Sequence, residues 1–157
     1  MKNEWIAAFS QMTYGIYVLT AAHGERINGM IASWVSQASY DPPLVLAAVH
    51  PNRYSHHLIE KSGAFALHVI GRERRDFLGR FKGPDTAAKF DSIRWRKGKT
   101  GSPILDDCIA WLECRVVDRL SPGNHTLFIG EVAAAGARDG GDALSTADYD
   151  GVYLGRS

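Results

Sequence analysis

The chain has 157 residues, enough for one domain whose core needs no disulfide bridges. Hydrophobic residues make up 45% and charged residues 22%, which is typical of a globular protein rather than a disordered one. The formal net charge is +1, so no overall field favours nucleic acid or an anionic membrane as a partner. We therefore expect a single domain over residues 1–157 that binds neither.

The sequence shows no targeting or membrane signal. Glu4 is acidic, and the apolar stretch 5–9 is too short for a secretory leader. The longest apolar run, 44–49, is far below the roughly 20 residues that cross a bilayer. On one strand Cys108 and Cys114 would lie roughly 20 Å apart, beyond the reach of a disulfide. We expect a cytoplasmic protein with two reduced thiols and no metal.

The first half of the chain predicts one short helix followed by extended segments. Trp5, Ile6 and Phe9 recur at helical spacing and predict a helix over 3–11. Runs of β-branched and aromatic residues then predict strands, and the apolar run 44–49 is typical of a strand buried on both faces. The extended segments are 16–20, 27–39 and 44–49, with a turn at 23–26 and a stop at 41–43.

The second half mixes short helices with a long hairpin. Asn52 or Ser55 could cap a helix that ends at Gly63, and a charged helix over 72–81 carries three apolar residues on one side. The remaining predictions are strands at 65–70, 109–120, 125–135 and 152–154, and a loop-rich stretch over 82–103. This order differs from regular strand–helix alternation and favours a barrel flanked by helices. Dinucleotide, P-loop and common hydrolase motifs are absent, so a nucleotide would be held in another way.

Several segments, in order along the chain, resemble the flavin reductase family. They are Gly29 to Ser39 leading into Asp41-Pro42-Pro43 and an apolar strand, 62–69, Phe81, Lys89-Phe90, 101–105, 112–115 and 124–132. Segment 13–18 is similar to the flavin domains of rubredoxin-fused members. The resemblance implies a mainly β fold with short helices, an FMN-binding split β-barrel that forms a homodimer, with FMN or FAD near the dimer interface.

The predicted ring-binding segment is small and polar. Gly29, Ala32 and Ser33 would let a flat ring approach the backbone closely. By resemblance, Met30, Ile31, Ala32 and Ser33 lie along the flavin ring, and Gln37, Ala38 and Ser39 lie near its pyrimidine side or its ribityl chain. The alternative is a plain strand whose serines face water.

A phosphate site is predicted at the start of the second helix, where free amides and the helix dipole favour an anion. Its candidate residues are Arg53, Tyr54, Ser55 and His56, joined through the resemblance by Phe81 and Lys82. The alternative is that Arg53 and Lys82 are solvated surface charges.

His125 is the predicted catalytic residue. By resemblance, a histidine at this position lies beside the nicotinamide or the flavin ring. Here Asn124 precedes it where the family usually has an aspartate, so the handling of the dinucleotide could differ. The alternative is a hairpin histidine bonded to nearby backbone.

The resemblance implies an oxidoreductase that transfers hydride from NADH or NADPH to FMN. The electrons would pass to free flavin, to a separate redox protein or to a monooxygenase. Hydride transfer needs stacked rings rather than a catalytic triad. The alternative is a non-enzymatic flavin or haem carrier or sensor, with His50, His68 or His125 as a haem ligand.

Overall fold

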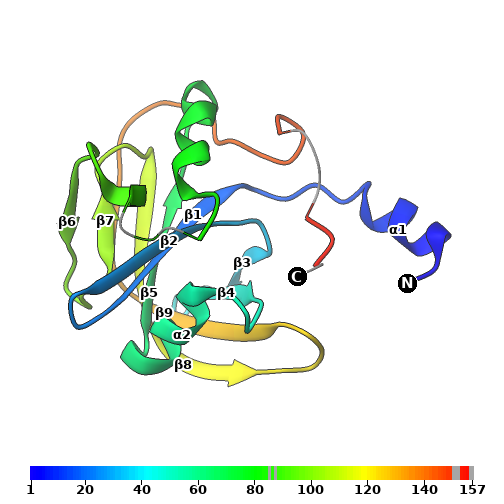
Figure 1. Ribbon diagram of the computed structural model, residues 1–157, viewed down its shortest axis with the longest axis horizontal. Helices are drawn as coiled ribbons and strands as arrows, with labels where there is room; N and C mark the ends of the chain where they lie inside the picture. The colour runs from blue at the N-terminus through cyan, green and yellow to red at the C-terminus, as the bar shows by residue number, and fades with distance from the viewer. Residues whose placement is uncertain (85, 87, 150–152, 156–157) are drawn as a thin grey trace.

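The computed structural model describes residues 1–84, 86, 88–149 and 153–155, and a curved sheet of seven antiparallel strands forms its centre (Figure 1). The strands run in the order β2-β1-β5-β8-β9-β4-β3. Their bounds are β1 (Tyr17–His23), β2 (Arg26–Ala32), β3 (Val35–Ser39), β4 (Leu44–Val49), β5 (Ala64–Val69), β8 (Ala110–Leu120) and β9 (Thr126–Ala137). The edge strands β2 and β3 follow each other in the chain but each pairs with a different neighbour, so the barrel stays open. The predicted split β-barrel is confirmed.

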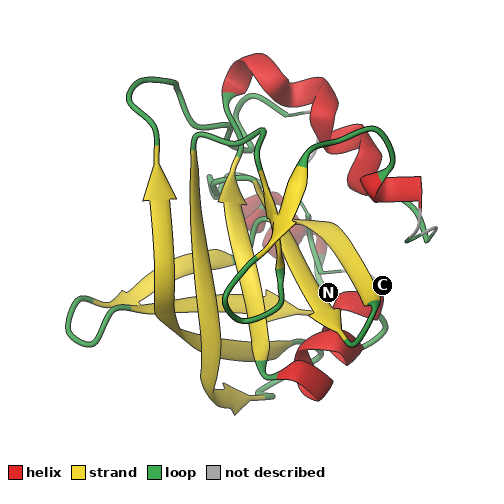
Figure 2. Cartoon of the chain, turned by 90° about the vertical axis from the view of Figure 1, so that its left-hand side faces the viewer, coloured by secondary structure: helices red, strands yellow, loops and turns green. Residues whose placement is uncertain are grey.

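Short helices and a small hairpin surround this sheet, whose strands run upright and across the view in Figure 2. These elements are α1 (Asn3–Phe9), α2 (Tyr54–Ser62), the 3-10 helices η1 (Arg72–Phe81) and η2 (Ala88–Phe90), and the paired strands β6 (Trp95–Lys97) and β7 (Pro103–Leu105). The helices α1, α2 and η1 are the predicted ones.

Two apolar clusters lie on opposite faces of the sheet. Successive strand residues point to opposite faces, and on β1 Leu19 packs in one cluster while Val18 packs in the other. The first cluster is covered by α2 and the second by η1. The predicted apolar side of η1, Phe77, Leu78 and Phe81, is buried in the second cluster.

The prediction that β4 is buried on both faces is wrong. Val45, Ala47 and Val49 are buried in the core, whereas Leu44, Leu46 and Ala48 alternate with them and are only half-buried. The neighbouring strands β1 and β5 are instead buried on both faces, since nearly all of their residues are buried. The second face of β4 is therefore apolar and partly open to solvent.

Three other local predictions need correction. The predicted stretch 27–39 is broken at Ser33 and Trp34, because β2 pairs with β1 while β3 pairs with β4. Helix α2 has Arg53 at its N-cap and no side-chain cap, so neither Asn52 nor Ser55 caps it, although Gly63 does end it with a φ of 67°. The loop-rich stretch 82–103 contains η2, β6 and the start of β7, which are too short to leave a periodic signal.

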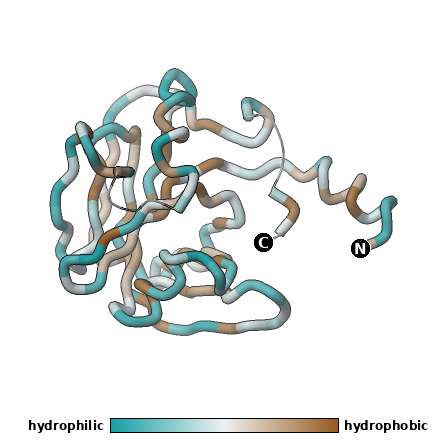
Figure 3. Tube along the Cα trace, viewed as in Figure 1, coloured by the Kyte–Doolittle hydropathy of each residue, from teal (hydrophilic) through white to brown (hydrophobic). Residues whose placement is uncertain are grey.

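The ends of the chain lie outside the barrel. Helix α1 has no buried residue and points away from the sheet (Figure 1), and Figure 3 shows hydrophobic positions on it. Of the predicted strand 152–154, Val152 lies outside the described residues, while Tyr153 and Leu154 are not in a strand. No helix in the described part of the chain is long and apolar enough to cross a membrane.

Both cysteines are free and buried. Cys114 lies on β8, and Cys108 precedes that strand, as in the predicted strand 109–120. Burial raises the pKa of Cys114 to about 12 and that of Cys108 to about 11. The two thiols are thus held in the unreactive protonated form.

Candidate functional site

A cavity of about 540 Å³ opens where the sheet is split. Its walls come from the end of β2, from Trp34, from the residues after β4, from the start of α2, from the end of η1 and from His125 and Tyr153. These segments are far apart in the sequence and meet because β2 and β3 do not pair. The volume lies within the range of small-molecule and cofactor sites.

The cavity collects part of the predicted ring-binding segment. Met30, Ile31, Ala32 and Ser33 line it. Gln37, Ala38 and Ser39 do not line it, because they lie after the interruption between β2 and β3, on the exposed edge strand β3.

Gly29 lies beneath Phe81 rather than in the cavity wall. A Cβ at this position would lie 2.6 Å from Cδ1 of Phe81, so only glycine lets that ring pack against β2. Phe81 itself lines the cavity. Gly29 therefore shapes the site through its neighbour.

The predicted phosphate-binding residues are divided in the same way. Arg53, Tyr54 and Lys82 line the cavity together with Asn52. Arg53 and Tyr54 form the N-terminal end of α2, where backbone amides lack helical partners. Ser55 instead is buried beneath them and accepts a hydrogen bond of 2.9 Å from Nδ2 of Asn28.

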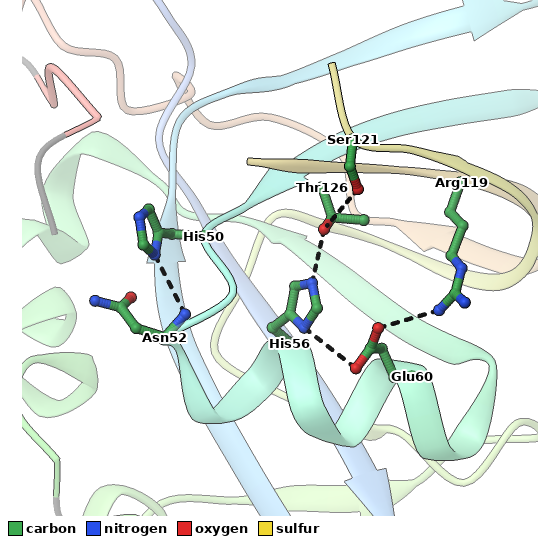
Figure 4. A network of polar contacts seen from close by, with 7 residues as sticks. All are labelled: His50, Asn52, His56, Glu60, Arg119, Ser121 and Thr126. Atoms are coloured by element: carbon green, nitrogen blue, oxygen red, sulfur yellow. Dashed lines mark hydrogen bonds and ion pairs between the residues drawn. The ribbon is translucent and has the colours of Figure 1, made fainter. Parts of the chain in front are cut away.

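His56 belongs to a separate network on the other side of α2 (Figure 4). Its Nε2 lies 2.8 Å from Oγ1 of Thr126, and its Nδ1 lies 3.6 Å from Oε2 of Glu60, which in turn pairs with Arg119. Burial lowers the pKa of His56, although the Glu60 carboxylate opposes this. His56 ties α2 to the β8–β9 hairpin and does not line the cavity.

A buried lysine forms part of the cavity wall. Lys89 is 5% exposed, and its Nζ donates to Oδ1 of Asn28 and to the carbonyl of Gly29, both at 3.0 Å. The cations Arg53 and Lys82 also line the cavity, and no carboxylate is found among the described residues that line it. The site therefore favours an anionic ligand.

His125 lies in the cavity wall beside Tyr153 of the C-terminal segment. It is 5% exposed and precedes β9 directly, and its ring lies 4.7 Å from Trp34 and 5.1 Å from His50. Its Nδ1 lies 2.8 Å from Oδ1 of Asn124, and its Nε2 lies 2.9 Å from the hydroxyl of Tyr153. Burial, together with His50 and Arg53, lowers the pKa of His125, so the neutral ring is favoured.

Residues 9–155 match the family described as the flavin reductase like domain. The match covers almost the whole chain. This chain is a flavin reductase-like protein. The predicted family is thereby confirmed.

Relatives with similar sequences are named as reductases or other redox proteins. The chain is 31% identical to the ferric-chelate reductase (NAD(P)H) of Archaeoglobus fulgidus over 97% of its own length and 92% of that protein. It is 32% identical to the high molecular weight rubredoxin of Moorella thermoacetica over 94% of its own length and 66% of that protein. Among solved structures, the NADH:FAD oxidoreductase of Streptomyces globisporus superposes with a TM-score of 0.84 at 27% identity, covering 92% of this chain and 89% of that one.

The residues of this flavin reductase-like protein fit a flavin. Two features serve the ring, since Met30 to Ser33 give a small-residue wall, and Nε1 of Trp34 is a buried donor without a partner in the described structure. Two serve the phosphate, since Arg53 starts α2 and Lys82 adds a second cation. These groups thus match the ring end and the phosphate end of a flavin nucleotide.

The histidines offer no comparable fit to haem. His68 is fully buried, its Nδ1 lies 3.0 Å from the carbonyl of Val18, and its Nε2 accepts from the backbone amide of Leu105 at 3.0 Å. His50 accepts the amide of Asn52 at Nδ1. Among the described residues, no three His, Cys, Asp or Glu side chains come together as a metal site.

The sequence did not identify several residues that line the cavity. Asn28, Trp34, His50, Lys89 and Tyr153 all contribute to its walls. For Lys89 the one signal was its place directly before Phe90 in a segment that resembles the family, because lysine is otherwise rarely buried. For Tyr153 there was none, because the segment that carries it has no regular structure.

Proposed function

We propose that this protein is an NAD(P)H-dependent flavin reductase that binds FMN in the cavity at the split of the barrel. The observation that carries the proposal is the cavity itself, with small residues on one wall and the cations Arg53 and Lys82 beside it, in a chain that belongs to the flavin reductase-like family. When bound, the flavin supplies the hydride-accepting ring. The protein binds and orients the two partners and keeps water from the ring.

The ring end of the site uses β2 and the residue after its break. Met30, Ile31, Ala32 and Ser33 would lie along the flavin ring, and Trp34 would donate from its buried Nε1. Gly29 acts by letting Phe81 pack against β2.

The phosphate end of the site uses the start of α2 and the residue after η1. Tyr54 would offer its backbone amide at the helix N-terminus, and the side chains of Arg53 and Lys82 would add charge. Ser55 and His56 support α2 from beneath rather than reaching the ligand. This arrangement serves a terminal monophosphate and is the reason to prefer FMN over FAD.

The protein is proposed to form a homodimer. Three features support this: the half-buried apolar face of β4, the exposed edge strand β3, and an α1 helix without a buried residue. Gln37, Ala38 and Ser39 lie on that edge strand and would enter the site only in the dimer. Sedimentation of the full chain tests this directly, and a monomer at micromolar concentration would reject it.

The electrons leave on reduced flavin or pass to a partner redox protein. The relative from Moorella, named a rubredoxin, supports an electron-transfer partner, and release of reduced flavin would serve a monooxygenase. We expect either NADH or NADPH as the donor.

The test mixes the purified protein with FMN and either NADH or NADPH without oxygen, and follows the bleaching of the flavin. Reduction faster than in the protein-free mixture is expected with at least one donor. No bleaching with either donor would reject the reductase while leaving flavin binding intact.

The phosphate site has its own test, which compares FMN with riboflavin. Arg53→Ala and Lys82→Ala should weaken FMN by about 10- to 100-fold each, as loss of a charge-assisted hydrogen bond does, and leave riboflavin affinity unchanged. Lys61→Ala, an exposed lysine at the far end of α2, is the matched control. Equal losses for FMN and riboflavin would place these cations elsewhere.

A further inference from the structure

Three side chains in the wall of the cavity form an ordered row of hydrogen bonds. Nδ2 of Asn124 donates to the carbonyl of Gly155 at 3.2 Å, Oδ1 of Asn124 lies 2.8 Å from Nδ1 of His125, and Nε2 of His125 lies 2.9 Å from the hydroxyl of Tyr153. His125 and Tyr153 both line the cavity. A second cavity of about 620 Å³ shares Trp34 and Tyr153 as walls.

The row has only one consistent assignment of protons. The carbonyl of Gly155 can only accept, so the amide NH₂ of Asn124 must face it and the amide oxygen must face His125. Nδ1 of His125 therefore carries the hydrogen. Nε2 of the neutral ring is then an acceptor, and the Tyr153 hydroxyl donates to it.

This order commits the hydroxyl hydrogen of Tyr153 to His125, and no group among the described residues donates to the hydroxyl oxygen. We propose that Tyr153 is a substrate-positioning residue, held by Asn124 and His125, whose hydroxyl oxygen accepts a hydrogen bond from an N–H donor of the bound dinucleotide. The carboxamide of nicotinamide is such a donor. The inference rests on the proposed reductase activity and names a further residue of its site.

An asparagine at position 124 is needed for this arrangement. An aspartate would accept from His125 equally well, but it could not donate to the carbonyl of Gly155 and would repel it. A carboxylate would also favour the charged form of His125. Asn124 therefore anchors the segment 153–155 and keeps Nε2 of His125 an acceptor.

The row reverses when His125 is protonated. Nε2 then becomes a donor, so the Tyr153 oxygen must accept from it and the hydroxyl hydrogen turns toward the substrate. The charged and titratable groups that face the ring are His50 after β4 and Arg53 at the start of α2, and both disfavour its positive charge. Dinucleotide binding should therefore weaken only at acidic pH.

Steady-state kinetics of the holoenzyme with FMN test the proposal. Tyr153→Phe should raise KM for the dinucleotide by about 2- to 10-fold, the factor contributed by one neutral hydrogen bond, with kcat and FMN affinity within about 2-fold of the wild type. Lys61→Ala, on an exposed lysine at the C-terminal end of α2, is the control and should change neither constant. An unchanged KM in an active Tyr153→Phe variant would overturn the proposal.

Asn124→Asp tests the anchor through the pH profile. The acid limb of kcat/KM should move to higher pH than in the wild type, because the carboxylate raises the pKa of His125. An acid limb that does not move would overturn the role of Asn124. A wild type without flavin reduction would instead reject the proposed function itself.

A measurement independent of activity reads the tautomer. In protein labelled with ¹⁵N-histidine, the His125 ring, assigned by loss of its signals in His125→Gln, should show hydrogen on Nδ1 at neutral pH. Hydrogen on Nε2 would overturn the proposed order whatever the kinetics of the Tyr153 and Asn124 variants show. The expected result in Asn124→Asp is a ring that stays protonated to higher pH.

Discussion

Replacing Gly29 with alanine should destabilise the protein, although the same change in an ordinary strand is favourable. The added Cβ would lie 2.6 Å from Cδ1 and 2.8 Å from Cε1 of Phe81, whereas carbon atoms pack at about 3.5–4.0 Å. The ring would have to move by about 1 Å. Phe77 and Phe90 limit that movement, since their ring centroids lie 5.3 Å and 6.2 Å from that of Phe81.

The expected cost of this overpacking is about 1–3 kcal/mol of unfolding free energy. For a chain of this length that corresponds to a fall in Tm of roughly 2–12 °C. Gly→Ala at an unstrained position would stabilise by about 0.4–1 kcal/mol instead. Close packing of Phe81 against Gly29 therefore predicts a loss of stability in Gly29→Ala, whereas an unstrained and uncrowded Gly29 predicts a gain.

Urea unfolding measures the free energy, and titration of FMN by fluorescence quenching measures the effect on the cavity that Phe81 lines. We expect Gly29→Ala to lower both stability and FMN affinity. Gly79→Ala, in the same η1 helix as Phe81 but with no atom within 4 Å of the new Cβ, should lower neither. Unchanged stability and affinity in Gly29→Ala would refute the close packing described here.

Three further predictions concern buried groups outside the cavity. Glu113 is buried and accepts hydrogen bonds from two backbone amides of the β6–β7 loop, so Glu113→Ala should cost about 1.5–3 kcal/mol in urea unfolding, while exposed Arg115→Ala should cost under about 0.5 kcal/mol. Burial lowers the pKa of His68 to about 4 from its ordinary 6.5, so as the pH falls the unfolded chain takes up this proton before the folded chain does. The free energy of unfolding should therefore fall between about pH 6.5 and pH 4, by about 3 kcal/mol in total. An NMR titration that shows His68 protonated near pH 6.5 in the folded protein would contradict this. Cys108 and Cys114 should resist a thiol reagent at pH 8 until the protein unfolds, and rapid labelling of the native protein would contradict their burial.

The strands were predictable wherever one local signal agreed with the final packing. The apolar run 44–49 became β4 within the same bounds, and the charged helix over 72–81 became η1. The burial of β4 was not predictable in the same way. An apolar run shows that a strand can be buried on both faces, but only the arrangement of its neighbours shows whether the second face is covered within one chain.

The site was predictable where neighbouring residues share one wall. Met30, Ile31 and Ala32 end β2 and Ser33 follows it directly, and all four line the cavity because the sheet is split beside this edge strand. The segment that resembled the family continued to Ser39, and the resemblance gave no sign that the extended segment is interrupted at Trp34. That break separates Gln37 from the cavity, because β3 pairs with β4 rather than extending β2.

Side chains that act through another residue are the hardest to predict. Gly29 and Ser55 have the residue types of a ligand site, a small residue and a hydroxyl, yet each supports the cavity from behind its wall. Lys89 shows the reverse, since lysine is usually a surface residue, but here it is buried and its ammonium donates to the carbonyl of Gly29. Residue type restricts what a side chain can do chemically, while the layer in which the fold places it determines whether it touches the ligand. The roles assigned to Arg53 and Tyr153 therefore follow from their place in the wall, which is why each can be tested by a substitution that leaves the fold intact.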